Sequence, residues 1–97
     1  MIDNLSKIMV STKCIDELKK IVDYDILVSL SCNYENINSN IKLLSSYGIE
    51  NMDELFINKY YIFVEEPEKL VKKFSKYNIP VFIQIINNDC NAIDTIM

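Results

Sequence analysis

The chain has 97 residues, a net charge of −4 and a hydrophobic fraction of 49%. These values are typical of one compact domain, taken here as residues 1–97, and they exclude disordered, collagen-like and disulfide-scaffold proteins. All ten basic residues are lysines, histidine and arginine are absent, and Gly48 is the only glycine. The chain therefore lacks an imidazole base, a bidentate arginine clamp and a glycine-rich phosphate loop. We expect a protein that is not an enzyme and uses no cofactor.

The three cysteines, Cys14, Cys32 and Cys90, lie far apart in the sequence. Without a C-x-x-C spacing there is no pattern for a zinc or thioredoxin-like site, so no metal is expected. An odd number of cysteines without a signal peptide favours buried thiols in a reducing cytoplasm. No apolar run approaches the ~18–20 residues of a membrane span. The sequence predicts a soluble, cytoplasmic protein.

A first helix is predicted to begin near Ile15. Residues 15–18, Ile-Asp-Glu-Leu, are matched by Met-Asp-Glu-Leu at residues 52–55, a shift of 37 positions. The helices that follow these two segments match at a shift of 30. The connection in the first copy is therefore expected to be longer, and we place the extra length around residues 31–36.

The strongest internal match joins residues 40–49 to residues 70–79. Apolar residues recur in both segments at the three- and four-residue spacing of one helix face. A Tyr-Gly-Ile ending in the first segment is matched by Tyr-Asn-Ile in the second. Gly48 and Asn78 thus occupy the same place after the last turn, where these residue types most readily take a left-handed conformation. We predict two helices that both end in this way.

Local signals indicate further helix ends. Asn51, followed three residues later by Glu54, predicts a capped helix that begins at Met52. Pro67 and Pro80 fit the first turn of two more helices, where proline is tolerated. The ion pairs expected four residues apart near Pro67 are Glu65–Lys69 and Glu68–Lys72.

Three apolar runs, near residues 26–30, 61–64 and 81–86, allow a second interpretation. They are rich in β-branched and aromatic residues, which is typical of strands that alternate with helices. Periodicity does not separate a buried strand from a buried helix over so few residues. An α/β fold with strands in these runs is therefore the alternative. We favour helices because one helical stripe continues through the last run, and it consists of Ile79, Phe82, Ile86, Ile93 and Met97.

Together these elements predict an all-α domain, a short stack of about three helical repeats of about 30 residues each. Residues 37–49 follow the pattern I-x-x-N-I-K-L-L-x-x-x-G-I, and a D-E-L helix from residue 53 closes in the apolar pair Ile62 and Phe63. This pattern, over residues 15–96, resembles the repeats of the mitochondrial transcription termination factors. The resemblance implies a curved solenoid of two-helix units and a nucleic-acid-associated function.

The chain departs from that family in two ways. Family repeats usually carry a proline where this chain has Asp25 and Tyr61, and family members hold nucleic acid on a basic, arginine-rich surface. This chain is acidic and has no arginine. We therefore adopt the family's architecture as a hypothesis and expect no strong binding to nucleic acid.

Charged residues form two kinds of candidate site. A possible basic stripe is spaced along one predicted helix, where it either follows a phosphate backbone or forms an ordinary solvated face. It consists of Lys69, Lys72, Lys73 and Lys76. Four lysines in a net-acidic chain make a weak field that salt screens, which favours the solvated face. Neighbouring acids such as Asp53 and Glu54 point about 100° apart on a helix and do not converge on a catalytic or metal site.

An apolar surface near the last unit is the other candidate. A helical repeat does not bury its apolar face alone, so a terminal unit needs either a polar cap or a partner. Neither end of this chain resembles a polar cap. The possible interaction surface consists of Phe82, Ile86, Ile93 and Met97. The sequence thus predicts a small helical-repeat interaction module that binds a protein partner or itself as a dimer, with a nucleic-acid-associated module as the alternative.

Overall fold

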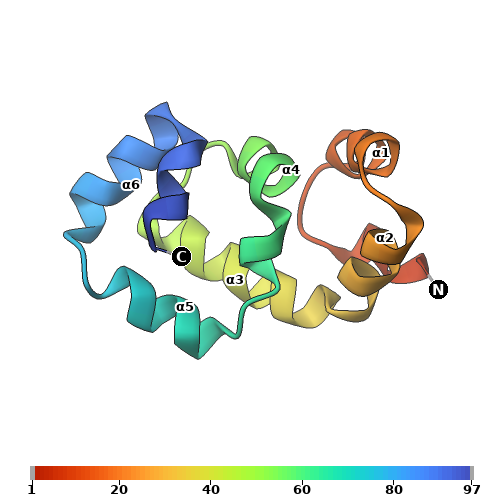
Figure 1. Ribbon diagram of the computed structural model, residues 1–97, viewed down its shortest axis with the longest axis horizontal. Helices are drawn as coiled ribbons and strands as arrows, with labels where there is room; N and C mark the ends of the chain where they lie inside the picture. The colour runs from red at the N-terminus through yellow and green to blue at the C-terminus, as the bar shows by residue number, and fades with distance from the viewer. Residues whose placement is uncertain (1, 97) are drawn as a thin grey trace.

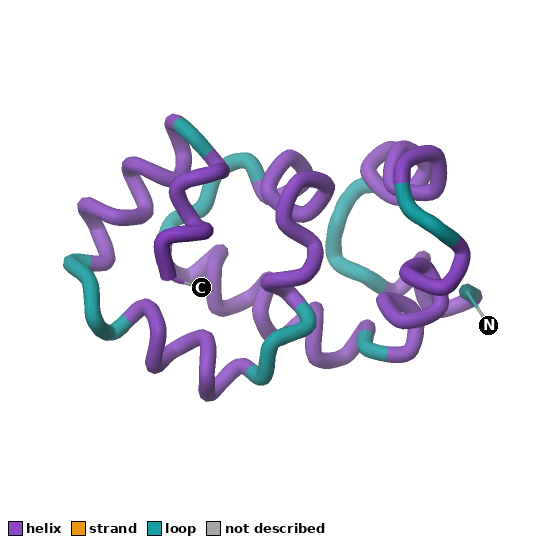
Figure 2. The backbone as a smooth tube through the Cα atoms, viewed as in Figure 1, coloured by secondary structure: helices purple, strands orange, loops and turns teal. Residues whose placement is uncertain are grey.

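A computed structural model describes residues 2–96 of the chain (Figure 1). All regular structure within these residues is helical, without a strand (Figure 2). A short 3₁₀ helix, η1, precedes six α-helices, and a second 3₁₀ helix, η2, follows them. Their bounds are η1 Asp3–Lys7, α1 Thr12–Ile21, α2 Tyr24–Cys32, α3 Tyr34–Tyr47, α4 Met52–Phe63, α5 Pro67–Phe74, α6 Ile79–Asn88 and η2 Cys90–Ile96.

The all-α prediction is confirmed, and the strand alternative is wrong for all three apolar runs. Residues 26–30 lie inside α2, residues 81–86 lie inside α6, and residues 61–63 end α4, with Val64 as its C-cap. The first and last runs bury side chains at helical spacing, as Leu27 and Leu30 do in α2. The β-branched residues therefore reflect the isoleucine-rich composition rather than a sheet.

Helix α3 is the central element of the fold. It is the longest helix, and it packs against η1, α2, α4, α5 and α6. Helix α1 packs on α4, whereas η2 folds back onto α4 and α6. The molecule is elongated, 38 × 25 × 20 Å, with α1 and α2 at one end of the long axis and α6 at the other (Figure 1).

The segments that match in the sequence lie in helices. The extra residues of the first copy, predicted to form a longer connection, form another helix instead. Residues 15–18 and 52–55 lie in α1 and α4, and the pair at a shift of 30 lies in α3 and α5. Between α1 and α3 the chain inserts the whole of α2, which is separated from α3 by Asn33 alone. The expected connection around residues 31–36 is therefore wrong, because these residues complete α2 and begin α3.

The two predicted left-handed helix ends differ. Gly48 follows α3 with φ +108°, as predicted. Asn78 has φ −73° and begins the next helix instead, since its side-chain oxygen accepts a hydrogen bond from the Val81 amide at 3.3 Å. Helix α5 has already ended at Phe74. The asparagine side chain caps the start of α6, which favours an extended backbone over a left-handed one.

Other predicted helix starts are confirmed in position. Helix α4 begins at Met52, although the side chain of Asn51 makes no capping hydrogen bond. Pro67 and Pro80 lie in the first turns of α5 and α6. Both sites suit proline because the amides of a first turn have no partner within the helix.

The ion pairs near α5 are not the expected ones. Glu65 precedes the helix, so the four-residue geometry does not apply to it, and its carboxylate meets Lys73 at 3.3 Å. Glu66 meets Lys69 at 4.0 Å on the solvent side. These two pairs replace the predicted Glu65–Lys69 and Glu68–Lys72 pairs.

Candidate interaction surface

The apolar surface predicted from the last helical stripe is buried. Phe82, Ile86 and Ile93 are 7%, 3% and 0% exposed, and Met97 lies outside the described residues. The predicted stripe is not one helix, because Asp89 is extended (φ −151°, ψ 104°) and separates α6 from η2. This break turns η2 back onto α6 and α4, and Ile93 fills the core between them. The periodicity correctly placed Phe82 and Ile86 on one face of a helix, but that face of α6 points into the core.

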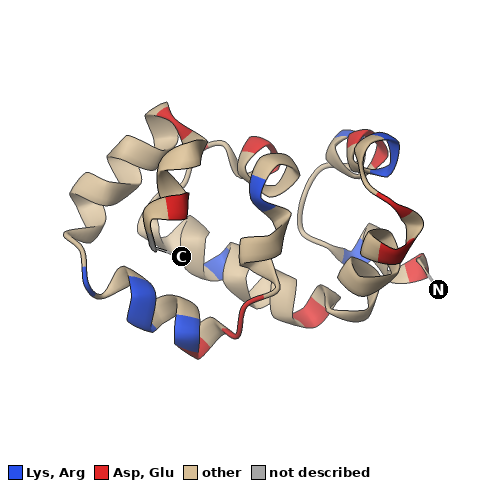
Figure 3. Cartoon of the chain, viewed as in Figure 1, with Lys and Arg blue, Asp and Glu red and all other residues tan. Residues whose placement is uncertain are grey.

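The opposite face of α6 is the apolar surface that the structure exposes. Val81 and Ile85, one helical turn apart, are 53% and 48% exposed. The chain carries no charge from Tyr77 to Asn88, so α6 is uncoloured in Figure 3. The sequence contained a signal for this face, since Val81 and Ile85 lie off the stripe that contains Phe82 and Ile86.

Tyr77 fixes the turn that leads into α6. Its ring stacks on Phe82 with centroids 4.7 Å apart and planes inclined by 19°. Its hydroxyl donates a hydrogen bond to the Thr95 carbonyl at 3.1 Å, which ties the turn to η2. Although Tyr77 is 39% exposed, both the ring stacking and the hydrogen bond fix its position. The α6 face thus begins on a well-anchored turn.

Three of the four predicted stripe lysines are exposed. Lys69 and Lys72 are on α5, and Lys76 is in the turn to α6 (Figure 3). Lys73 is instead half-buried and pairs with Glu65. The stripe is therefore divided, because one of its members serves to hold the α4–α5 turn.

A polar cluster near η2 was not predicted from the sequence. Asp94 accepts hydrogen bonds from the Lys59 ammonium at 2.6 Å and from the Tyr61 hydroxyl at 2.8 Å. Residues two apart in a regular helix point about 160° apart. Both donors reach one carboxylate because α4 is kinked at Lys59 (φ −135°, ψ 38°). No sequence signal joins residues 35 positions apart in this way.

The pKa shifts in this cluster indicate a structural clasp, that is, a set of contacts that holds α4 and η2 together. The hydrogen bond to Asp94 raises the pKa of Lys59 and that of Tyr61, and the two donors lower the pKa of the Asp94 carboxyl. Each group is therefore held more firmly in its ordinary neutral-pH state. A general acid or base needs a pKa moved towards neutrality, which is the opposite change.

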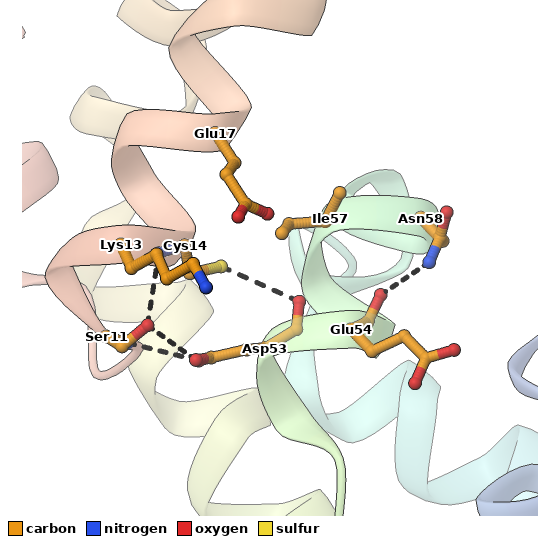
Figure 4. A pocket seen from close by; sticks show the side chains of 8 residues that line it. All are labelled: Ser11, Lys13, Cys14, Glu17, Asp53, Glu54, Ile57 and Asn58. Atoms are coloured by element: carbon orange, nitrogen blue, oxygen red, sulfur yellow. Dashed lines mark hydrogen bonds between the residues drawn. The ribbon is translucent and has the colours of Figure 1, made fainter.

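A second polar cluster lies in a depression of about 340 Å³ between α1 and α4 (Figure 4). Ser11 caps α1 by accepting a hydrogen bond from the Cys14 amide at 3.1 Å. Its hydroxyl donates to an Asp53 carboxylate oxygen at 2.5 Å, and its amide donates to the other at 3.1 Å. These bonds attach the start of α1 to the first turn of α4.

The thiol in this depression is not an activated nucleophile. Burial, together with the nearby carboxylates of Asp53 and Glu17, raises the pKa of Cys14 to about 12. The thiol also donates a weak hydrogen bond to the Asp53 carbonyl at 3.6 Å. A reactive cysteine needs a lowered pKa and access to solvent, whereas Cys14 is 2% exposed.

Over residues 2–96, no group of three or more cysteine, aspartate or glutamate side chains is placed to hold a metal ion. No helix in the same part of the chain is long and apolar enough to cross a membrane.

Comparisons with protein families, with characterised proteins and with solved structures find no match to this chain. The resemblance to the termination-factor repeats therefore stays a hypothesis.

Proposed function

We propose that this protein is a small, non-enzymatic helical interaction module that binds another protein chain through the outer face of α6. The observation that carries the proposal is the exposure of Val81 and Ile85 on a helix without charge. Exposed apolar side chains are common singly, but an uncharged helix at one end of a molecule is typical of a contact surface. Its rigid attachment through Tyr77 and η2 keeps the cost of ordering the surface low.

The stack interpretation supports this role. We interpret α1–α3, α4–α5 and α6–η2 as three successive units of unequal length, the first enlarged by α2. In such a stack each unit covers a face of its neighbour. None of residues 2–96 covers the Val81–Ile85 face of α6, which lies at one end of the long axis (Figure 1).

The polar clusters support a non-enzymatic role. Asp53 is engaged by Ser11, and Asp94 is engaged by Lys59 and Tyr61, so both carboxylates hold helices together. Neither cluster pairs a nucleophile with a base that could activate it.

Nucleic-acid binding is the second candidate, and the exposed lysines of α5 and of the turn before α6 favour it. Lys69, Lys72 and Lys76 are followed by no acidic residue until Asp89. The net charge of −4 opposes it, because binding to nucleic acid depends on neutralising phosphates. We expect affinity no better than the non-specific range of about 10⁻⁴–10⁻⁶ M at physiological salt. Submicromolar binding that is abolished by Lys72→Glu with Lys76→Glu, two exposed positions, would establish this candidate instead.

A photo-crosslinking experiment tests the proposed interaction module. A photoreactive phenylalanine analogue is placed at residue 81 in the cells that produce the protein, and adducts are identified by mass spectrometry. Val64 offers the matched control position, since it is also an exposed valine but lies at the end of α4. We expect a defined protein adduct from residue 81 and none from residue 64. The absence of adducts at residue 81, or the same adducts at both positions, contradicts the proposal.

A further inference from the structure

The segment η2 is joined to α6 through a single hinge residue, Asp89 (Figure 1). The Asp89 amide donates a hydrogen bond to the Ile85 carbonyl at 2.9 Å, which ends α6. Its carboxylate accepts a hydrogen bond from the Asn91 amide at 3.1 Å, which caps the start of η2. The backbone of Asp89 is extended, with φ −151° and ψ 104°. The direction in which η2 leaves α6 therefore depends on this residue.

The apolar pattern of the sequence continues through the hinge. Its members are spaced by three, four, four and three positions, as on one face of a continuous helix. They are Ile79, Phe82, Ile86, Cys90 and Ile93. A helix that ran straight through Asp89 would also give intrahelical partners to carbonyls of the last turn of α6, which a helix that ends at Asn88 does not provide. The sequence is thus compatible with two directions of η2, folded back or straight.

The folded-back η2 is held by one buried side chain and by the polar clasp. Ile93 is fully buried between α4 and α6. Asp94 accepts the hydrogen bonds of Lys59 and Tyr61, which belong to α4. These partners all precede the hinge in the chain. A second copy carries the same partners, so its α4 and α6 offer η2 an identical docking place.

We propose that Asp89 is a hinge through which two copies of this chain exchange their η2 segments, each η2 docking between α4 and α6 of the other copy. The second copy is the occupant because this place already fits η2 in shape and in charge. The exchange is reciprocal, so it closes as a symmetric dimer in which the docking contacts of the monomer are made again. The exchange does not rest on the proposed function, since η2 packs on the inner face of α6 and the proposed partner on the outer face.

The exchanged dimer is expected to form during refolding. Exchange requires Ile93 to leave the core, which makes it slow in the folded protein. In refolding from denaturant, η2 meets either its own chain or a second one, so the share of dimer should rise with protein concentration and persist after dilution. Dimers formed through the outer face of α6 would dissociate on dilution and would be prevented by Val81→Glu. The same substitution should leave the exchanged dimer unchanged.

Substitutions at Asp89 test the hinge. Asp89→Ala removes the oxygen that accepts the Asn91 amide hydrogen, and alanine favours a continuous helix. Both effects destabilise the folded-back monomer, so the dissociation constant of the dimer should fall by about tenfold or more. Asp89→Asn is the matched control, because asparagine caps a helix as well as aspartate does, and it should dimerise like the wild type. Sedimentation after refolding measures the dimer, and circular dichroism checks that the helices are retained.

Mixing two clasp variants tests whether η2 crosses between copies. Lys59→Asp and Asp94→Lys each place like charges at the clasp, both in the monomer and in a dimer of either variant alone. A mixed dimer with exchanged η2 segments regains opposite charges at both clasps. We expect native mass spectrometry of isotope-labelled chains refolded together to show more mixed dimer than dimer of either variant. Both substitutions on one chain restore the clasp without a second variant, and this control should dimerise like the wild type.

The outcomes separate the exchange from the proposed function. The exchange is overturned if the wild type and Asp89→Ala both stay monomeric after refolding at high concentration, or if the clasp variants show no preference for the mixed dimer. A crosslink from residue 81 to a foreign protein would still support the interaction module in that case. Persistent dimers that survive Val81→Glu, without any crosslink from residue 81, support the exchange and contradict the interaction module.

Discussion

The two halves of the hydrophobic core are built from different side chains. All four phenylalanines lie in the second half of the chain, and three of them are fully buried. Phe56 meets Phe63 edge to face at 5.1 Å, while Phe74 lies 5.3 Å from Tyr47 and 5.6 Å from Phe82 between ring centroids. The first half contains no phenylalanine. Its buried apolar residues are Leu5, Ile8, Cys14, Ile15, Leu18, Leu27, Leu30, Ile37, Ile41, Leu44 and Ile49.

The first half compensates with polar attachments between segments. Asn38 of α3 accepts a hydrogen bond from the Met9 amide at 2.8 Å and donates one to the Lys7 carbonyl at 2.9 Å. The Ser31 hydroxyl accepts one from the Asn4 amide at 3.2 Å. Hydrogen bonds near the surface compete with water, whereas aromatic packing does not. We therefore expect the aliphatic half to open before the aromatic half.

Removal of a buried phenylalanine is expected to destabilise the aromatic half more than any other change that we propose. Phe74 is fully buried between α3 and α6, so Phe74→Ala should lower the free energy of unfolding by about 3–5 kcal/mol. Chemical denaturation measures the loss. Native-state hydrogen exchange should show that α5 and α6 lose their protection first in the variant, whereas α1 and α2 do so in the wild type.

Leu18→Ala is the matched change in the aliphatic half. Leu18 is fully buried, and its truncation should cost about 2–5 kcal/mol without exchanging the order in which the halves open. If Phe74→Ala costs less than Leu18→Ala and leaves α5 and α6 protected, the two halves do not differ as described.

Features that depend on residues close together in the sequence were predictable, whereas contacts between distant residues were not. The helices and the left-handed Gly48 depend on neighbouring residues, and periodicity predicted them. The helix end assigned to Asn78 failed because asparagine serves equally as the cap of a following helix. Residues 26–30 were predicted to be helical, but their separation from α1 as the inserted helix α2 was not.

The interaction surface was harder to predict than the helices. Helix α6 is apolar on two faces, so periodicity alone does not say whether Phe82 or Val81 points outwards. The break at Asp89 decides this by folding η2 onto the Phe82 face. The Lys59–Asp94 clasp is equally inaccessible from the sequence, because it requires a kink in one helix and the return of another.

Asn40 of α3 attaches the first half to the aromatic half through buried polar contacts. Its fully buried amide donates hydrogen bonds to the carbonyls of Phe63 at 2.8 Å and Glu65 at 2.6 Å. Asn40→Ala leaves these carbonyls without that donor and should cost about 1–3 kcal/mol in denaturant unfolding. Asn38→Ala, whose bonds are exposed, should cost less. The reverse order would show that the polar attachments of the first half are the stronger ones.

Gly48 tests a smaller, conformational contribution at the end of α3. Its φ of +108° is a conformation that L-residues rarely adopt, and an added Cβ would lie 3.6 Å from Ile83 Cγ2, an ordinary contact. Gly48→Ala should therefore cost about 1–2 kcal/mol through the backbone alone. Gly48→Asn should cost less, because asparagine tolerates the left-handed region better. Equal losses for both variants would indicate a steric rather than a conformational cause.

The last test uses the cysteines as reporters, because each half contains one whose side chain is at least partly buried. Cys14 lies in the aliphatic half, half-buried Cys90 begins η2, and exposed Cys32 serves as the reference. Burial and nearby carboxylates raise the pKa of Cys14 to about 12, so little thiolate forms before the pH approaches that value. Because this pKa is raised on folding from about 9, its contribution to stability is complete below pH 9 and is lost as the pH rises towards 12.

At pH 7.5 a thiol reagent followed by mass spectrometry should therefore modify Cys32 within the time in which Cys14 remains intact. Modification of Cys14 then requires opening of the α1–α4 contact, so its rate measures how often the aliphatic half opens. Low concentrations of denaturant should accelerate Cys14 modification before global unfolding begins, while Cys90, held against the aromatic half, follows global unfolding more closely. If Cys14 and Cys90 accelerate together, the chain opens as one cooperative unit. The difference between the two halves would then lie in their composition and not in their stability.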